Sequence, residues 1–289
     1  MHIKEIIDSL KLFDRTYKDN EIEEALARKD EIIPYLIEIL EEVLSYPEKY
    51  KEDENCFGHI YSLMLLGHFK ENRAHKIIVD LFSLPNDLPS QLFGDTVTED
   101  LHVVLLNTCG GTFQEIKRLA LNQEAYEYCR GSALKAIAYG VVSGILARED
   151  AILFYKELLE NRKRAPHSHF YDALACCILD LYPEELIELI KQSYEDGYIN
   201  PGYVGFESFE EALNEGKEKC LERLSDELEE RSLENLHQHM SWWACFKHES
   251  SGNLICSEKG SKKQGKKQKK NKTRIIKASK RKNRKKKRK

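Results

Sequence analysis

Residue types that bind transition metals gather towards the C-terminus of the chain. They are His237, His239, Cys245, His248 and Cys256. Imidazole nitrogens and thiolates are ligands that zinc prefers. However, no Cys-x2-Cys pair accompanies them, and side chains two positions apart point in different directions on a helix. The sequence therefore favours ordinary surface and packing roles, and we predict neither a metal site nor a cofactor.

Other reactive side chains have equally simple interpretations. Cys176 and Cys177 form a vicinal pair in an apolar helix, where small thiols pack well. His167 and His169 precede that helix, and a helix end explains them as well as a catalytic base does. Gly110-Gly111 comes before a helix start, where an anion can bind, but no strand or Lys-Thr/Ser pair accompanies it. We interpret it as a helix stop.

One further set of polar residues supports an alternative hypothesis. Asp95, Glu99 and His102 lie close in sequence within residues 92–111. An enzyme with a site between helices there would bring Asp95 and His102 together in a concave pocket. Without a recognised catalytic motif, we predict no enzymatic activity and keep this as a lower alternative.

The C-terminal segment, residues 259–289, has a composition unlike the rest. It holds 19 of the 45 lysines and arginines and no acidic residue, so residues 1–258 have 26 basic and 49 acidic residues, a net charge of −23. Such a segment cannot form a core and is predicted to be disordered. The residues expected to contact a polyanion are Lys262, Lys263, Lys266, Lys267, Lys269, Lys270, Arg281, Lys282, Arg284, Lys285, Lys286, Lys287, Arg288 and Lys289.

This basic tail has four competing interpretations. Neutralising phosphates releases counterions, which gives sequence-independent binding to RNA, the ribosome or DNA. The tail has no aromatic residue on which bases could stack, so base-specific recognition is not expected. The alternatives are a nuclear address in a bacterial effector delivered to a host cell, contact with the chain's own acidic body, and a solubilising extension.

The size and the cysteines narrow the class of protein. A chain of 289 residues can be one elongated repeat domain, because arrays grow by stacking. Eight cysteines without an early apolar signal segment indicate reduced thiols and a cytoplasmic protein, with the nucleus of a host cell as the alternative location if the chain is an exported effector. The longest mostly apolar run, residues 136–147, is too short to cross a bilayer, so no membrane insertion is expected.

The apolar residues recur with a helical period along most of the chain. Residues 3–13, 31–44, 57–68 and 74–82 are predicted helices, and residues 130–197 read as two successive helical hairpins. Residues 83–95 contain two prolines and are predicted to be a long loop. Three Ser/Thr-x-x-Glu capping boxes, at Thr96, Thr112 and Ser208, predict helix starts, the last opening one helix to about residue 230.

The second helices of the hairpins recur at similar intervals. Aligning Ile77, Ile116, Ile152 and Ile187 gives steps of 39, 36 and 35 residues, near the length of HEAT, armadillo and tetratricopeptide units. Because the tetratricopeptide signature is absent, we predict an all-α, HEAT-like helical-hairpin array, or α-solenoid. The expected divisions are residues 1–50, an N-terminal helical segment; 51–230, the repeat domain; 231–258, a cap; and the tail.

Aromatic residues mark the predicted cap. Trp242, Trp243 and Phe246 supply apolar surface in a charged region. We expect them to belong to a cap over the last hairpin, since arrays need terminal caps. The alternative is an exposed patch that binds a partner.

Several short motifs resemble a known family. They are Leu92-Phe-Gly-Asp-Thr, Cys109-Gly-Gly, Tyr126-Glu-Tyr-Cys-Arg130, Asp180-Leu-Tyr-Pro-Glu-Glu185, Tyr194-Glu-Asp-Gly197, Asn200-Pro-Gly202 and Trp243-Ala-Cys-Phe246. Over roughly residues 56–246 the sequence is similar to the bacterial family known as domain of unknown function 1186. The resemblance implies an all-helical, HEAT-like domain of bacterial type, and therefore a bacterial cytoplasmic protein, and it supplies no catalytic residue.

Some members of that family end in a cysteine-rich SEC-C zinc segment. Cys256 and the following Gly260 to Lys263 resemble a degenerate form of it, but the other ligands are missing. The sequence thus favours a non-enzymatic scaffold that binds an unknown protein through its repeats and nucleic acid through its tail.

Overall fold

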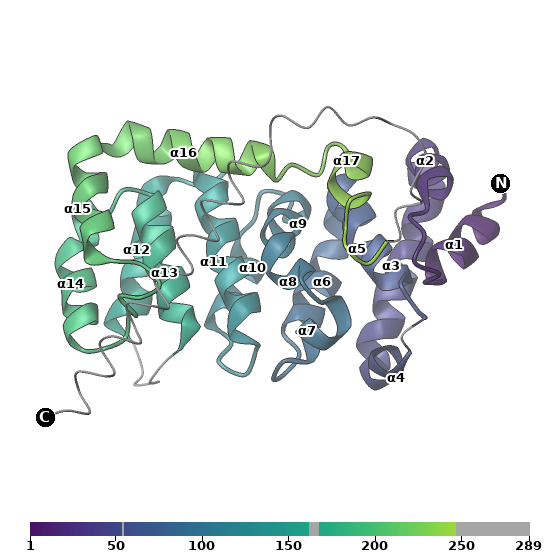
Figure 1. The fold of residues 1–289 in the computed structure, drawn as a ribbon, viewed down its shortest axis with the longest axis horizontal. Helices are drawn as coiled ribbons and strands as arrows, with labels where there is room; N and C mark the ends of the chain where they lie inside the picture. The colour runs from purple at the N-terminus through teal and green to yellow at the C-terminus, as the bar shows by residue number, and fades with distance from the viewer. Residues whose placement is uncertain (54, 162–167, 247–289) are drawn as a thin grey trace, which may run out of the picture. The chain divides into compact units, whose positions relative to one another are not determined.

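Every regular element of the described chain is helical. The computed structural model describes residues 1–53, 55–161 and 168–246 (Figure 1). Within these ranges the only extended pairings are isolated bridges of Leu12 with Cys56 and of Pro85 with Ala125. The predicted all-α class is confirmed, whereas the basic tail lies outside the described residues.

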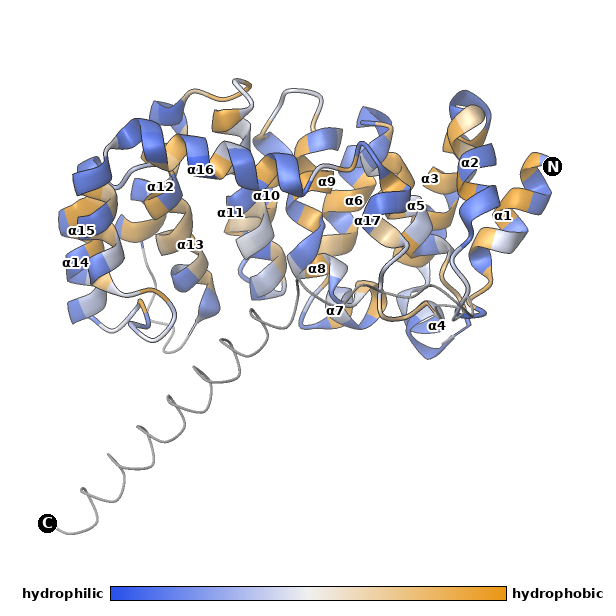
Figure 2. Cartoon of the chain, turned by 45° about the horizontal axis from the view of Figure 1, so that its top comes forward, coloured by the Kyte–Doolittle hydropathy of each residue, from blue (hydrophilic) through white to orange (hydrophobic). Residues whose placement is uncertain are grey.

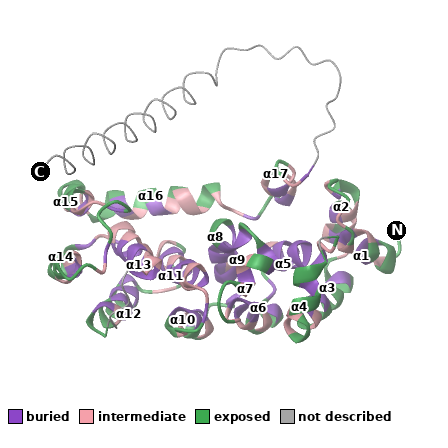
Figure 3. Ribbon diagram, turned by 60° about the horizontal axis from the view of Figure 1, so that its bottom comes forward, coloured by how far each residue is buried: buried purple, intermediate pink, exposed green. Residues whose placement is uncertain are grey.

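The helices of the array form two layers (Figure 3). The first layer consists of α5 (Gly58–His68), α9 (Leu101–Thr108), α11 (Glu127–Val142) and α13 (His169–Asp180), each packed on the next. The second layer consists of α6 (His75–Phe82), α10 (Gln114–Leu121), α12 (Arg148–Glu160) and α14 (Ile187–Glu195). The four isoleucines that gave the repeat spacing all lie in second-layer helices or at the start of one, which confirms a helical repeat array.

Shorter and terminal helices complete the described chain. The N-terminal helices are α1 (Ile3–Lys11), α2 (Asp19–Ala27), α3 (Lys29–Ser45) and α4 (Pro47–Glu52). The connections contain η1 (Asn72–Ala74), α7 (Leu88–Phe93), α8 (Thr96–Glu99) and η2 (Glu184–Leu186). The last helices are α15 (Phe206–Glu215), α16 (Lys217–Glu230) and α17 (Leu236–Met240).

Helix α11 lies at the centre of the array and is buried on nearly all sides. It packs against α9, α10, α13 and α16, and small residues allow these close approaches. The Gly131 backbone lies against the Ala173 side chain, and a Cβ atom at Gly140 would lie 2.3 Å from the Phe113 ring. Along the array as a whole, apolar residues face the interior of the layers, and polar residues face outward (Figure 2).

The predicted long loop, residues 83–95, is partly helical. Helix α7 occupies its second half, with Pro89 in the first turn, where a proline is tolerated. Buried Leu92 and Phe93 give this short helix an apolar face. The prediction of a loop over this whole range was therefore wrong in its second half, because Pro89 lies in the first turn of a helix, whereas Pro85 precedes it.

The three predicted capping boxes do not form. Thr96 is the first residue of α8, and its hydroxyl donates to the Phe93 carbonyl. The Thr112 hydroxyl donates to the Cys109 carbonyl, and α10 begins only after Phe113. Phe113 is buried against α11, so its packing and not the hydroxyl sets where this helix begins.

The third box also fails, and the long acidic helix is divided. Ser208 is the third residue of α15. Gly216 then ends α15 with a φ of +93°, a conformation that glycine adopts without strain, and α16 starts in a new direction. This break directs the rest of the chain along the array.

Candidate functional site

A C-terminal strap crosses the first layer of the array. We define the strap as residues 216–246, comprising α16, the link 231–235, α17 and the final turn. Helix α16 packs on α11 and α13, whereas α17 packs on α5 near the start of the chain (Figure 1). The cap was expected over the last hairpin, but α16 is about 21 Å long and returns the chain to the first helices.

Apolar side chains anchor the far end of the strap. Leu233, Leu236 and Met240 are at most 2% exposed. The Phe246 ring, 4% exposed, lies 5.3 Å from the Tyr17 ring and 5.7 Å from the Phe57 ring between centroids. Burying such a side chain fully contributes roughly 1.5–3 kcal/mol each, so the strap is an integral part of the fold.

The three aromatic residues of the proposed partner patch lie in different environments. Phe246 is buried, and the Trp243 ring stacks parallel to it at 6.3 Å. Trp242 is 67% exposed. The described structure therefore offers one exposed indole at this place, whereas the other two rings belong to the cap.

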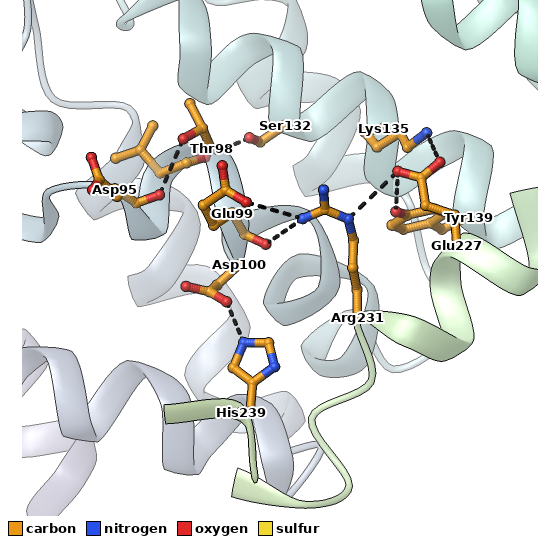
Figure 4. A network of polar contacts seen from close by, with 11 residues as sticks. Asp95, Thr98, Glu99, Asp100, Ser132, Lys135, Tyr139, Glu227, Arg231 and His239 are labelled. Carbon is orange, nitrogen blue, oxygen red and sulfur yellow. Dashed lines mark hydrogen bonds and ion pairs between the residues drawn. The ribbon is translucent and has the colours of Figure 1, made fainter. Parts of the chain in front are cut away.

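Charged side chains join the middle of the strap to the array (Figure 4). The Lys135 ammonium group lies 2.7 Å from the Asp180 carboxylate and 2.8 Å from the Glu227 carboxylate. The Tyr139 hydroxyl donates to the other oxygen of Glu227 at 3.1 Å. Lys135 thus links two first-layer helices, α11 and α13, to the strap helix α16.

Burial and charge oppose each other in this cluster. Burial raises the pKa of the Asp180 carboxyl, and Lys135 only partly offsets that effect. Burial also disfavours the charged form of Lys135, yet the nearby carboxylates outweigh it and hold the pKa of that ammonium group above its usual range. The three groups are therefore interdependent, and removing one leaves the others uncompensated.

Arg231 and His239 extend the contacts along the strap. Arg231 donates to the Glu99 carbonyl at 3.1 Å and lies 3.5 Å from the Glu227 carboxylate. The His239 Nε2 atom lies 2.5 Å from the Asp100 carboxylate, which is 4% exposed (Figure 4). Sequence reasoning missed these pairings because Asp100 and His239 are 139 positions apart.

The residues of the enzyme hypothesis do not meet. Asp95 and Glu99 are exposed, whereas His102 is buried at 4% exposure. The His102 Nε2 atom has no hydrogen-bond partner among the described residues. Burial, with help from Arg231 and Lys135, lowers the pKa of His102 to about 3, so its imidazole is neutral. The predicted pocket with convergent Asp95 and His102 is therefore wrong.

The candidate zinc ligands are separated where they are described. The His237 ring lies between two carboxylates, with Nδ1 2.8 Å from Asp19 and Nε2 2.8 Å from Glu23. His239 pairs with Asp100 instead. Asp19 and Glu23 lie at different ring nitrogens of His237, and no group of three such side chains among the described residues could hold a metal ion; His248 and Cys256 lie outside those residues. Cys245 is half-buried, which raises the pKa of its thiol.

The remaining reactive candidates also have packing neighbours. Cys177 is buried, and Cys176 lies at an intermediate depth, where burial raises the pKa of its thiol to about 11. The His169 ring lies 4.5 Å from the Tyr128 ring and 4.8 Å from the Tyr203 ring. His167 falls outside the described residues. These surroundings are typical of structural side chains.

The motif residues around Asp180 fix a turn between two repeats. Arg148 donates to the Leu181 carbonyl at 2.6 Å and to the Tyr182 carbonyl at 2.7 Å, and it forms a two-pronged ion pair with Glu185. Arg148 holds the pKa of the Glu185 carboxyl below its usual range. The clamp secures Tyr182, whose φ is +71°. Sequence reasoning missed Arg148, although its motif partners were recognised.

Two other motif segments fix turns in the same way. The Glu127 carboxylate accepts hydrogen bonds from the Ser168 hydroxyl and the His169 amide. The Asp172 carboxylate accepts one from the Asn200 amide at 2.7 Å. These two carboxylates therefore hold the connecting segments in place through hydrogen bonds to them.

Comparison with known proteins agrees with these motifs. The sequence model of the family described as "Protein of unknown function (DUF1186)" matches residues 1–247. The chain belongs to this family. The family match includes the whole strap and ends before the basic tail.

Two relatives carry the name "Uncharacterized protein". The one from Chlamydia trachomatis is 31% identical over 253 residues, which cover 86% of this chain and 99% of the relative. The one from Chlamydia muridarum is 30% identical over 253 residues, which cover 86% of this chain and 100% of the relative. No solved structure matches the chain. Within the described ranges, no helix is long and apolar enough to span a bilayer.

Proposed function

We propose that this protein is a non-enzymatic scaffold whose helical array binds a protein partner and whose basic tail contacts nucleic acid without sequence preference. The observation that carries this proposal is how the array uses its charged groups. Lys135, Arg148 and Arg231 each bond to carboxylates or carbonyls of other helices and turns. Charged groups that are paired with other parts of the fold hold the shape of a surface. Catalysis instead needs charged groups that point towards a substrate.

The tail supplies the second part of the proposal. Its 19 basic residues without an acid give a segment suited to polyanions, while the body carries a net charge of −23. The matched family region ends at residue 247, so the tail lies outside it. Binding through it should weaken as salt rises, because counterion release drives it.

The experiment compares the full chain with a variant in which the lysines and arginines of residues 281–289 are replaced by glutamine. Both are tested for binding to a single-stranded RNA and a duplex DNA of arbitrary sequence at about 50 and 200 mM salt. We expect the variant to bind more weakly and to have a shallower salt dependence. Equal binding by both chains, or no salt dependence, would disprove the nucleic-acid role.

The array's role is tested separately. The full chain and the tail variant are each used to capture proteins from a lysate of the source cells after nuclease treatment. A protein retained by both chains supports partner binding through the array. Loss of every protein after nuclease treatment would show that capture depends on nucleic acid alone.

The terminal basic cluster also has the composition of a nuclear import signal, which is the basis of the alternative function. A fluorescent reporter fused to residues 259–289 should then accumulate in the nuclei of eukaryotic cells. A reporter that stays in the cytosol counts against that alternative.

A further inference from the structure

An open groove runs beside α10 in the second layer of the array. Its volume is about 850 Å³, and its lining includes Gly111, Phe113, Lys117, Leu121, Ile145 and Leu146. These residues come from the turn before α10, from α10 itself and from the turn that follows α11. Helix α10 lies in the second layer, whereas the strap helix α16 packs on the first layer (Figure 3).

The groove marks a break in the packing of the second layer. Helix α6 packs on α10, and α12 packs on α14, but α10 and α12 do not form a comparable pair. The Lys117 ammonium group reaches across and lies 5.0 Å from the centre of the Phe154 ring on α12. The layer therefore has an open position beside α10.

The groove exposes apolar side chains in one place. Leu121 is 55% exposed and Ile145 is 47% exposed, while Phe113 is buried. Covering the exposed part of each of these two side chains would contribute on the order of 1 kcal/mol. Exposed apolar residues that gather at one groove are typical of a binding surface.

The charges at the groove favour an acidic ligand. Among the described residues, no carboxylate lies within ion-pair distance of Lys117, whereas Arg118 is already paired with Asp80 and Glu115. Gln114 at the N-terminal end of α10 also lines the groove, and the helix dipole places partial positive charge there; Glu115 in the same turn lines the groove too, but its carboxylate is paired with Arg118. Both features disfavour the chain's own basic tail as the occupant.

We propose that this groove binds an amphipathic helix of a protein partner, with an aspartate or glutamate beside its apolar face. Helix α10 is about 12 Å long, which matches two turns of a bound helix with apolar residues at positions i, i+3 or i+4, and i+7. The bound carboxylate would meet Lys117. This inference rests on the proposed scaffold function and names the surface and chemistry of the partner.

The test uses a phage library of 14-residue helical peptides with that apolar stripe and with acidic, basic or neutral flanking residues. The target is the full chain. We expect enrichment of peptides with acidic flanks and, in anisotropy titrations, about tenfold weaker binding to Leu121→Asp and to Ile145→Asp. Leu153→Asp is the matched control, because Leu153 is 56% exposed on α12 and does not line the groove.

A charge reversal tests the electrostatic part. Lys117→Glu should weaken binding of the acidic peptide and strengthen binding of its lysine counterpart. Because the substituted apolar side chains are exposed and Lys117 is only partly buried, circular dichroism and thermal unfolding should match the wild type. A groove variant that unfolds early is replaced by Ile145→Ser, which keeps the test of apolar contact.

Several outcomes would overturn the proposal. They are no enriched peptide, enrichment of basic peptides, and binding that the groove variants do not affect. A dimer in sedimentation that Ile145→Asp disperses would assign the groove to a second copy instead. If the nuclease-resistant partner still binds the double variant Leu121→Asp, Ile145→Asp, the groove assignment fails while the scaffold function stands.

Discussion

Replacing Lys135 with methionine should destabilise the fold through two carboxylates that remain behind. The ammonium group lies between Asp180 and Glu227, and its side chain is 20% exposed. Removing one member of a buried ion pair typically costs about 3–5 kcal/mol. Because the Asp180 side chain is 28% exposed, solvent screens part of this effect, and we expect a loss of about 2 kcal/mol.

The loss should depend on pH. Burial already raises the pKa of Asp180 in the folded protein, and without Lys135 that pKa rises further. A carboxyl with a raised folded pKa contributes stability below its unfolded pKa, and this contribution is lost as pH rises through the folded pKa. The deficit of Lys135→Met should therefore be largest near pH 7 and shrink towards about pH 4, because Asp180 becomes protonated as the pH falls through its raised pKa.

Urea unfolding followed by circular dichroism at both pH values measures these differences. Lys156→Met is the matched control, because Lys156 forms an exposed pair with Glu160 at 3.7 Å and should lose less than about 0.5 kcal/mol. Adding Asp180→Leu to Lys135→Met should recover part of the stability, since the more buried of the two carboxylates is then removed and Glu227 keeps Arg231 at 3.5 Å. Equal losses for Lys135→Met at pH 7 and pH 4, or a loss no larger than the control's, would refute the reasoning.

Four smaller predictions concern single contacts. His239→Ala leaves the buried Asp100 carboxylate without its imidazole partner and should cost about 1–3 kcal/mol in thermal or urea unfolding, with partial rescue by glutamine. Arg148→Lys should cost about 1–2 kcal/mol in the same assay, because an ammonium group cannot bond both carbonyls and the carboxylate together. Gly140→Ala should cost about 1–3 kcal/mol, since its Cβ atom would lie 2.3 Å from an aromatic ring; unchanged stability would contradict that packing. Cys176 should react slowly with iodoacetamide at pH 7 by mass spectrometry, and its rate should rise as pH approaches about 11.

Periodicity predicted the helices well because packing in an array is mostly local. The stripes at residues 31–44 and 57–68 correspond to α3 and α5, and the repeat spacing located the second layer. Helix starts were predicted less well. At Thr112 a hydroxyl with a glutamate three residues later indicated a capping box, but burial of the neighbouring Phe113 determined where α10 begins.

The path of the strap could not be predicted from the sequence, for a different reason. Its contacts pair Glu227 with Lys135 and His239 with Asp100, and no local pattern encodes partners so far apart. Gly216 was the one local sign that the long acidic helix is divided, because glycine is unfavourable within a helix. The break there directs α16 back along the array. The sequence also could not show that Asp95 faces solvent while His102 faces the core. Their closeness along the chain was the only basis for giving them a joint role.

The position of Phe246 bears on how the chain is made. Its ring fills a pocket whose walls include Tyr17, Phe57 and Tyr61. During synthesis at about 5–20 residues per second, that pocket stays unfilled for roughly ten seconds or more after its walls have left the ribosome. A nascent chain stopped before residue 246 would expose these rings, so the N-terminal region closes only after the strap has been made.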